Sequence, residues 1–196
     1  MGTATKPRRR MPPGARRQLI RREGTRLFGL YGYAATRLDD VALAAGVTKP
    51  MVYHHFASKK DLYLAILSRH EAELPLFIEG APASSNPTDV VGVILDGWLD
   101  YVEENSDTWL VIFRDRTGDA EIERARRAVN ARASDVLAAF IRETARGIPP
   151  DEIEPTADLL RSGLAGLVLW WIDHPEASRE AVHATAARAC AALLGY

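Results

Sequence analysis

The chain carries VALAAGVT at residues 41–48, followed at once by KPMVYHHF at residues 49–56. The first segment has small residues where two helices could cross closely, and Gly46 can form the turn between them. The second segment begins after Thr48, and Pro50 falls in the first turn of a helix, where an amide proton would have no partner. This passage therefore predicts two short helices joined by a tight turn, which is the helix-turn-helix pattern.

The second of these helices has an unusual surface. Val52 and Phe56 are four residues apart and are expected to face the core. The outward positions then carry large apolar, aromatic and basic side chains, which are costly on an exposed surface unless something binds there. A DNA major groove would give them partners, namely base edges, thymine methyl groups and phosphates. The side chains concerned are Lys49, Met51, Tyr53, His54 and His55.

Helices are also predicted on both sides of this motif. Apolar residues recur with helical spacing over residues 20–31, and glycines that follow can cap that helix. Thr36 with Asp39 is typical of a capping pair, and Ser58 with Asp61 repeats the pattern at the start of a longer helix. The first seventy residues therefore form three short helices and the beginning of a fourth, with no room for a strand.

The rest of the chain reads as helical as well. Residues 109–113 are apolar all round and could form a short buried strand by composition, but their helical surroundings favour a helix. We therefore predict an all-α protein of about nine helices, with a helical ligand-binding and dimerisation domain after the N-terminal domain. The five later helices are expected at 88–104, 106–115, 119–146, 152–173 and 176–194.

Charge is sorted along the chain. The 196 residues contain 25 Lys and Arg and 26 Asp and Glu, for a net charge of −1. Residues 1–70 hold fourteen basic and four acidic residues, a net of +10, and the remainder has a net of −11. Such asymmetry indicates a segment that faces nucleic acid or membrane, attached to something else.

Composition excludes several other classes of protein. A hydrophobic fraction of 47% is sufficient for a core, and a single cysteine, Cys190, cannot form an internal disulfide. No apolar run approaches the roughly 18 residues that span a membrane, and no secretory signal is visible, so a cytoplasmic protein without a membrane partner is expected. His54 and His55 are adjacent and diverge by about 100° on a helix, so we expect neither a metal site nor a cofactor.

Residues 16–64 resemble the N-terminal DNA-binding domain of the TetR (tetracycline repressor-like) transcriptional regulators. The resemblance is carried by the alanine–glycine–valine turn at 45–47, by VYHHF at 52–56 and by Lys59. It implies that Lys49 and Met51 contact bases and that the other positions contact phosphate. His54 departs from the family, which often has an aromatic residue there, so the operator sequence is not predicted. The full set of implied DNA-binding residues is Thr36, Thr48, Lys49, Met51, Tyr53, His54, His55 and Lys59.

Three segments follow from these patterns. Residues 1–13 are predicted to be a disordered basic arm, in which Arg8–Arg10 either contact DNA or only solubilise the chain. Residues 14–60 form the helix-turn-helix domain, and residues 61–196 form the effector-binding and dimerisation domain.

The last two helices are predicted to pair with a second copy of the chain. They are rich in small residues, which allow helices to approach closely, and two helices from each copy would form a four-helix interface. TetR-like proteins dimerise in this way, although the same residues could instead fill an ordinary core. The expected interface residues are Gly163, Leu164, Leu167, Ala184, Ala187 and Ala191.

The resemblance also implies a ligand cavity in the second domain. Its expected lining is aromatic, which favours a small, largely apolar effector, with Arg114 or Arg116 as a possible anchor for an anionic group. An apolar cavity above about 300 Å³ among residues 88–171 would support this hypothesis, whereas a solid core would contradict it. The expected lining residues are Trp98, Trp109, Phe113 and Trp170.

The sequence thus predicts a DNA-binding transcriptional regulator that binds a palindromic operator as a homodimer and is released by its effector. A repressor is favoured, but the sequence does not decide between repression and activation. An enzyme is not expected, because the chain has no nucleophile elbow, phosphate loop or metal-spaced cluster. An architectural DNA-binding dimer without a ligand shares every feature of the first seventy residues, and only the C-terminal cavity distinguishes the two.

Overall fold

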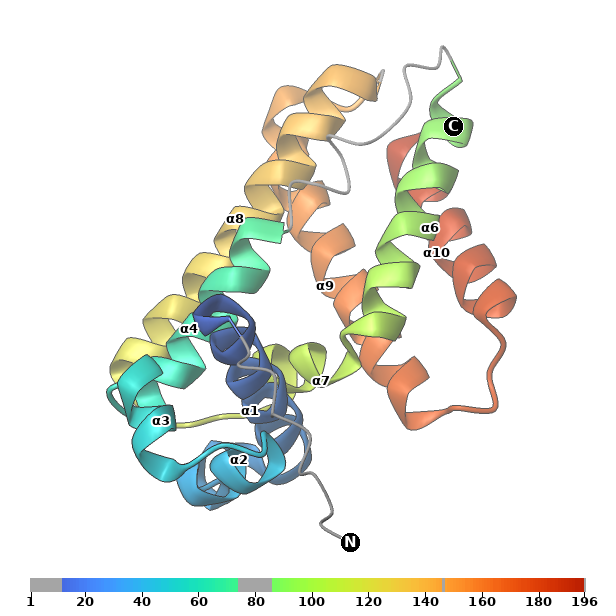
Figure 1. Cartoon of the computed structure of the whole chain (residues 1–196). Coiled ribbons are helices and arrows are strands. Elements are labelled where there is room, and N and C mark those ends of the chain that lie inside the picture. Colours follow the sequence, from blue (N-terminus) through green and yellow to red (C-terminus); the bar gives the residue numbers. More distant parts are fainter. Residues whose placement is uncertain (1–11, 74–85, 146, 196) are drawn as a thin grey trace, which may run out of the picture.

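The computed structural model describes residues 12–73, 86–145 and 147–195. Within these ranges the chain is all helical, with nine α-helices and no strand, as the sequence predicts. The basic arm predicted for residues 1–13 lies almost entirely outside the described residues. α1 (Pro13–Ala35), α2 (Leu38–Ala44) and α3 (Lys49–His55) form the N-terminal part, and α4 (Lys59–Glu73) leads away from it toward the long α8 (Figure 1).

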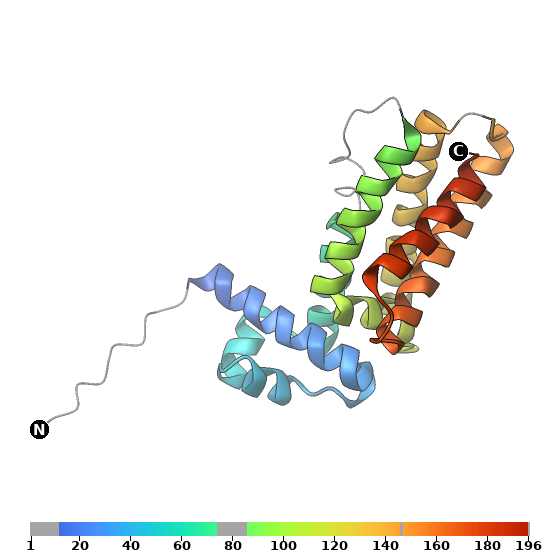
Figure 2. The same cartoon turned by 90° about the vertical axis from the view of Figure 1, so that its right-hand side faces the viewer.

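The remaining helices form a second layered body. α6 (Pro87–Glu104) and α7 (Ser106–Trp109) are followed by a π-helical turn (Leu110–Arg114), and then by α8 (Ala120–Thr144). A short 3-10 turn (Pro150–Glu152) precedes α9 (Ile153–Asp173), and α10 (Arg179–Leu194) ends the described chain. Figure 2 shows α6, α8, α9 and α10 running alongside one another above the N-terminal helices. α8 packs against both α4 and α9, and α10 packs against α6 and α9.

Local signals set several helix ends. The Ser58 hydroxyl accepts from the Asp61 amide at 3.0 Å, and the Asp61 carboxylate accepts from the Ala57 amide at 2.9 Å, so this predicted capping pair is confirmed. The corresponding prediction for Thr36 is wrong. Arg37 precedes α2, with no side-chain cap, and Thr36 is used elsewhere.

The segment 109–113 is helical, as its surroundings indicated. It differs from the expectation in one respect, because residues 110–114 form a π-turn rather than a continuation of the α-helix. π-Turns of this kind are often found at functional positions. Val111 and Ile112 in this turn are fully buried and belong to the core of the N-terminal part. The π-turn therefore packs against the N-terminal helices.

Two apolar cores divide the molecule. The first joins α1–α3 to α4, the π-turn and the beginning of α8, and the second joins α6–α10. The first core therefore extends through α4, past residue 60, where the sequence placed a domain boundary. The division at residues 60 and 61 stays a prediction.

Candidate DNA-binding interface and ligand cavities

The turn between α2 and α3 fixes the direction of α3. Gly46 has φ +61°, a conformation that favours glycine, and the Val47 amide donates to the Ala42 carbonyl at 3.0 Å. Val52 and Phe56 are fully buried on the inner side of α3, as predicted. The opposite side of α3 is therefore held toward solvent by the packing of its inner side.

The outer side of α3 forms a shallow groove of about 390 Å³. The structure brings four of the predicted DNA-binding residues together here, from the end of the turn and from α3 itself. It adds Arg16 from α1, which the sequence did not assign to the interface because it is far from α3 along the chain. The lining residues are Arg16, Thr48, Pro50, Met51, His54 and His55.

The polar side chains around this groove differ in whether they already form a hydrogen bond or ion pair within the protein. Thr48 is exposed and its hydroxyl makes no capping hydrogen bond, so it is free to bind a ligand. Tyr53 is exposed beside the groove. The Lys49 ammonium lies 2.8 Å from an Asp39 carboxylate oxygen, and this hydrogen bond raises the pKa of Lys49. Lys49 must leave Asp39 in order to contact a base.

Two histidines and two arginines gather at the same end of α3. The rings of His54 and His55 meet edge to face at 5.1 Å, and the Arg17 guanidinium lies 4.6 Å from the centre of the Phe56 ring. Partial burial lowers the pKa of His55, and the charges of His54, Arg16 and Arg17 lower it further. A phosphate at this position would be attracted to the two arginines and would favour the charged form of His55.

Thr36 does not match the role that the resemblance implied. Its side chain is buried, and its hydroxyl lies 3.1 Å from the Leu27 carbonyl and 2.8 Å from the Gly32 carbonyl. A buried hydroxyl that already donates inside the protein is not presented to a DNA phosphate. The structure instead gives Thr36 a role in closing the corner between α1 and α2.

Lys59 is likewise engaged inside the protein. Its ammonium donates to the carbonyls of Tyr33, Ala34 and Thr36 at 2.7, 3.2 and 3.0 Å, and it lies 4.5 Å from the centre of the Tyr33 ring. These three bonds use all three protons of the ammonium group. Lys59 therefore caps the end of α1, and a phosphate contact would have to displace a carbonyl.

The apolar cavity of the second body is smaller than expected. It has a volume of about 110 Å³, which is below the predicted 300 Å³, and three of the four predicted aromatics line it, namely Trp98, Trp109 and Phe113. The fourth, Trp170, is outside the cavity because it is 47% exposed and stacks on His174 at 4.4 Å. The prediction was therefore wrong in the size of the cavity and for Trp170.

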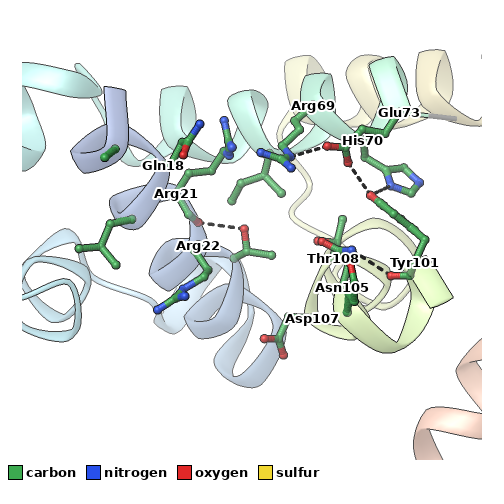
Figure 3. Close-up of a pocket in the computed structure, with 15 residues that line it drawn as sticks. Gln18, Arg21, Arg22, Arg69, His70, Glu73, Tyr101, Asn105, Asp107 and Thr108 are labelled. Atoms are coloured by element: carbon green, nitrogen blue, oxygen red, sulfur yellow. Dashed lines mark hydrogen bonds and ion pairs between the residues drawn. The ribbon is translucent and has the colours of Figure 1, made fainter. Parts of the chain in front are cut away.

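A larger and more polar cleft lies where the two bodies meet (Figure 3). Its volume is about 500 Å³, and its walls come from α1, α4 and the end of α6 with the beginning of α7. The sequence did not predict this cleft because its walls are separated by up to about ninety residues of chain. Among the described residues, no group of three or more His, Cys, Asp or Glu side chains is arranged to hold a metal ion.

The predicted dimer residues divide between the surface and the interior. Gly163 is exposed, but Leu164 lines the apolar cavity, and Leu167 and Ala187 pack partly against the second core. Ala184 and Ala191 are half-buried. The exposed side of α9 instead carries Leu159, Gly163, Gly166 and Trp170, of which Leu159 is 57% exposed.

None of the helices that the structure describes is both long and apolar enough to cross a membrane.

Comparison with known proteins agrees with the geometry of the N-terminal part. Residues 20–66 match the family described as "Bacterial regulatory proteins, tetR family". The HTH-type transcriptional activator FasR of Mycolicibacterium smegmatis is 32% identical over 105 residues, which cover 53% of this chain and 48% of that protein. The HTH-type transcriptional regulator AcrR of Shigella flexneri is 29% identical over 172 residues, which cover 82% and 80%.

Solved structures extend the similarity to the whole fold. A TetR-like transcriptional regulator from Rhodococcus sp. RHA1 superposes with a TM-score of 0.74 at 23% identity, covering 95% of this chain and all of that one. The chain spans about half the length of the first curated relatives that it matches. The matched proteins are named as transcriptional regulators, in agreement with the expectation that the chain is not an enzyme.

Proposed function

We propose that this chain, which belongs to the tetR family of bacterial regulatory proteins, binds double-stranded DNA as a homodimer and regulates transcription as a repressor. The observation that carries the proposal is the outer side of α3. It presents Thr48, Met51 and His54 along one groove, while its inner side is locked into the core. A helix of this kind fits the DNA major groove, and its exposed polar atoms meet base edges and phosphates.

Charge supports the same orientation. The fourteen basic residues among residues 1–70 give that part a net charge of +10, whereas the remainder carries −11. The basic part is attracted to the phosphate backbone, and the acidic part is repelled from it.

The proposed dimer uses the exposed side of α9 together with α10. One seven-residue helix reads too few base pairs for tight binding, so a second copy is required. Leu159 and Trp170 are large apolar side chains left in solvent, and Gly163 and Gly166 between them allow a partner helix to approach closely. A two-fold axis at this surface would place two α3 helices on a palindromic operator.

We also propose that a small effector releases the protein from its operator DNA. The apolar cavity touches the π-turn through Phe113, and Asp115 directly after this turn accepts a hydrogen bond from the Tyr33 amide at 2.8 Å. A ligand that shifts the π-turn would therefore move the end of α1. A cytoplasmic location is part of the same proposal, since the operator DNA lies there.

Selection of bound sequences from a random pool of duplex DNA tests this function. The full-length protein is expected to enrich a palindrome whose half-sites are about one helical turn apart or slightly more. Met51→Ala should change the preferred bases, because this side chain would contact base edges. The proposal is wrong if no sequence is enriched, or if the protein binds duplexes without a palindrome as tightly as the enriched duplexes.

A further inference from the structure

The polar cleft between the two bodies contains an arginine without a partner. The Arg21 guanidinium projects from α1 into the cleft and makes no hydrogen bond or ion pair with the described residues. Burial lowers the pKa of Arg21, and the nearby charge of Arg69 lowers it further. Because a guanidinium stays protonated in proteins, the cleft holds a partly desolvated positive charge, which the Glu73 carboxylate stabilises only through space, without a direct ion pair.

Arg69 brings a second guanidinium to the same part of the cleft from α4 (Figure 3). Its Nε atom lies 2.6 Å from one Glu73 carboxylate oxygen, so the two terminal nitrogens keep free protons. Two arginines from different helices with free donors form the usual arrangement for binding a carboxylate or phosphate group.

Three acidic residues line the cleft: Glu73 lies on α4, where it pairs with Arg69, and the other two lie on the opposite wall. Glu104 is near the end of α6 and Asp107 is in α7, whereas the arginines come from α1 and α4. Burial raises the pKa of Asp107, and the nearby charge of Arg26 lowers it. An anionic group is therefore best placed on the α1 and α4 side, where Arg21 has no direct ion pair and Arg69 pairs with Glu73 through Nε alone.

A row of three rings leads from this cleft into the apolar cavity. Tyr101 lines the cleft, Trp109 lines the cavity, and the buried His70 lines both. The His70 ring centre lies 5.6 Å from that of Tyr101 and 5.6 Å from that of Trp109. His70 is therefore the partition between a polar space and an apolar one.

The donors along this row are incompletely satisfied. His70 Nδ1 lies 2.8 Å from the Tyr101 hydroxyl oxygen, which lies 2.9 Å from a Glu73 carboxylate oxygen. The Trp109 side chain is 5% exposed, yet its indole N–H has no acceptor among the described residues. A buried donor without an acceptor costs free energy, which a ligand group with an oxygen atom could recover.

We infer that the cleft and the cavity together bind an amphiphile, with its anionic head between Arg21 and Arg69 and its apolar tail past His70 among Trp98, Trp109 and Phe113. This occupant is the effector, so the inference rests on the proposed function. The cavity alone, at about 110 Å³, is small for a ligand site, whereas the cleft of about 500 Å³ lies in the usual range. The sequence favoured a largely apolar effector with Arg114 or Arg116 as a possible anchor for an anionic group. In the structure Arg114 pairs with Asp173, and the arginines that line the cleft are on α1 and α4 instead.

Calorimetric titration of the full-length protein without DNA tests this site. The probes are decanoate, decyl phosphate and decanol, all below their micellar concentrations, and the three share one tail. We expect at least one anionic probe to bind ten times more tightly than decanol or better, because only the anions can pair with the arginines. Decanoate and decyl phosphate together distinguish a carboxylate head from a phosphate head.

Matched variants separate the two halves of the site. Arg21→Gln should weaken binding of the preferred anion about tenfold and leave decanol binding unchanged. Arg22→Gln is the control, because Arg22 lines the same cleft but pairs with Glu23 and is largely exposed. Ala133→Leu, which fills the apolar cavity, should weaken all three probes. Thermal unfolding of each variant establishes that it is folded.

The inference is overturned if the three probes bind equally, if none binds, or if Arg21→Gln leaves anion binding intact while Ala133→Leu abolishes it. Because the titration contains no DNA, its outcome is independent of operator binding. Loss of ligand binding with an enriched palindrome contradicts this inference alone, and ligand binding without any enriched DNA contradicts the proposed function alone.

Discussion

Single side chains near α3 fall into two groups, according to whether their polar atoms already bind the protein. Tyr53 and Thr48 are exposed, and no capping bond engages the Thr48 hydroxyl. Thr36 and Lys59 donate to backbone carbonyls at the end of α1 and hold the corner on which α2 begins. The first group is available to DNA in the proposed interface, whereas the second holds the helices that form it.

Tyr53→Ala is expected to weaken DNA binding about fivefold for every sequence, because one hydrogen bond to phosphate is worth about 1 kcal/mol and carries no base information. Electrophoretic titration with the selected operator and with an unrelated duplex measures this change. Tyr31→Ala is the matched control, since Tyr31 is an exposed tyrosine on α1, outside the proposed recognition helix. Unchanged affinity of Tyr53→Ala would contradict the docking of α3.

Lys59→Met should destabilise the fold rather than remove a phosphate contact. The variant loses three hydrogen bonds from a charged group to the Tyr33, Ala34 and Thr36 carbonyls, and we expect the free energy of unfolding to fall by roughly 1–3 kcal/mol. Urea denaturation measures this loss. Lys60→Met removes only surface ion pairs, with Asp119 and Glu121, and should cost less. Equal stability of the two variants would exclude a capping role for Lys59.

Acid should destabilise the protein through His70. Burial lowers the pKa of His70 from 6.5 to about 4, so the unfolded chain takes up this proton at a higher pH than the folded chain. The contribution is complete above about pH 6.5 and is lost as the pH falls toward 4, a change of about 3 kcal/mol. Denaturation of His70→Asn at pH 7.5 and 4.5 should show a smaller difference in stability than the wild type. An equal difference would exclude His70 as the source.

At the level of elements, the π-turn connects the two bodies. Asp115 follows it and accepts from the Tyr33 amide of α1, and the Tyr63 hydroxyl of α4 lies 3.1 Å from the same carboxylate oxygen and 2.9 Å from the Val111 carbonyl. Arg126 of α8 donates to that hydroxyl at 3.1 Å. α1, α4, α8 and the π-turn are thus joined through the Tyr63 hydroxyl and the Asp115 carboxylate. A shift of the π-turn would therefore move the end of α1.

Gly32→Ala tests the kink near the end of α1. Gly32 has φ +78° and ψ 166°, a conformation that is almost restricted to glycine, and an added Cβ would lie 3.5 Å from an Asp115 carboxylate oxygen. We expect a loss of unfolding free energy of about 1–3 kcal/mol in thermal or urea denaturation. Gly92→Ala in α6 is the control, because it is helical with open space around it and should stabilise slightly. A neutral Gly32→Ala would show that the kink is not required.

At the scale of the whole molecule, the basic N-terminal part and the exposed side of α9 lie on different bodies. This arrangement leaves α9 available to a second copy while α3 contacts DNA. Leu159→Glu places a charge in the proposed interface and should convert a dimer to a monomer in sedimentation velocity, with at least tenfold weaker binding to the full palindrome. Val93→Glu, at an equally open position on α6, should remain a dimer. A wild-type monomer at micromolar concentration would contradict the dimer.

Much of the architecture was predictable because it depends on local chemistry. Apolar spacing located nine helices, the Ser58 and Asp61 pair marked the start of α4, and Gly46 marked the turn before α3. The π-turn was not predictable, because residues 109–113 are apolar all round and therefore hide the shift of the apolar face that an extra residue produces. The exposed set on α3 followed from the burial of Val52 and Phe56, which the periodicity indicated.

The amino-acid order by itself therefore determined the helix-turn-helix, the family and the separation of charge, since these rest on residues close in the chain. Tertiary structure decided which polar groups remain free. It used the Thr36 hydroxyl and the Lys59 ammonium within the corner after α1, and it turned Trp170 outward and Leu164 inward. It also formed the cleft between Arg21 and Arg69, because only packing brings α1 against α4.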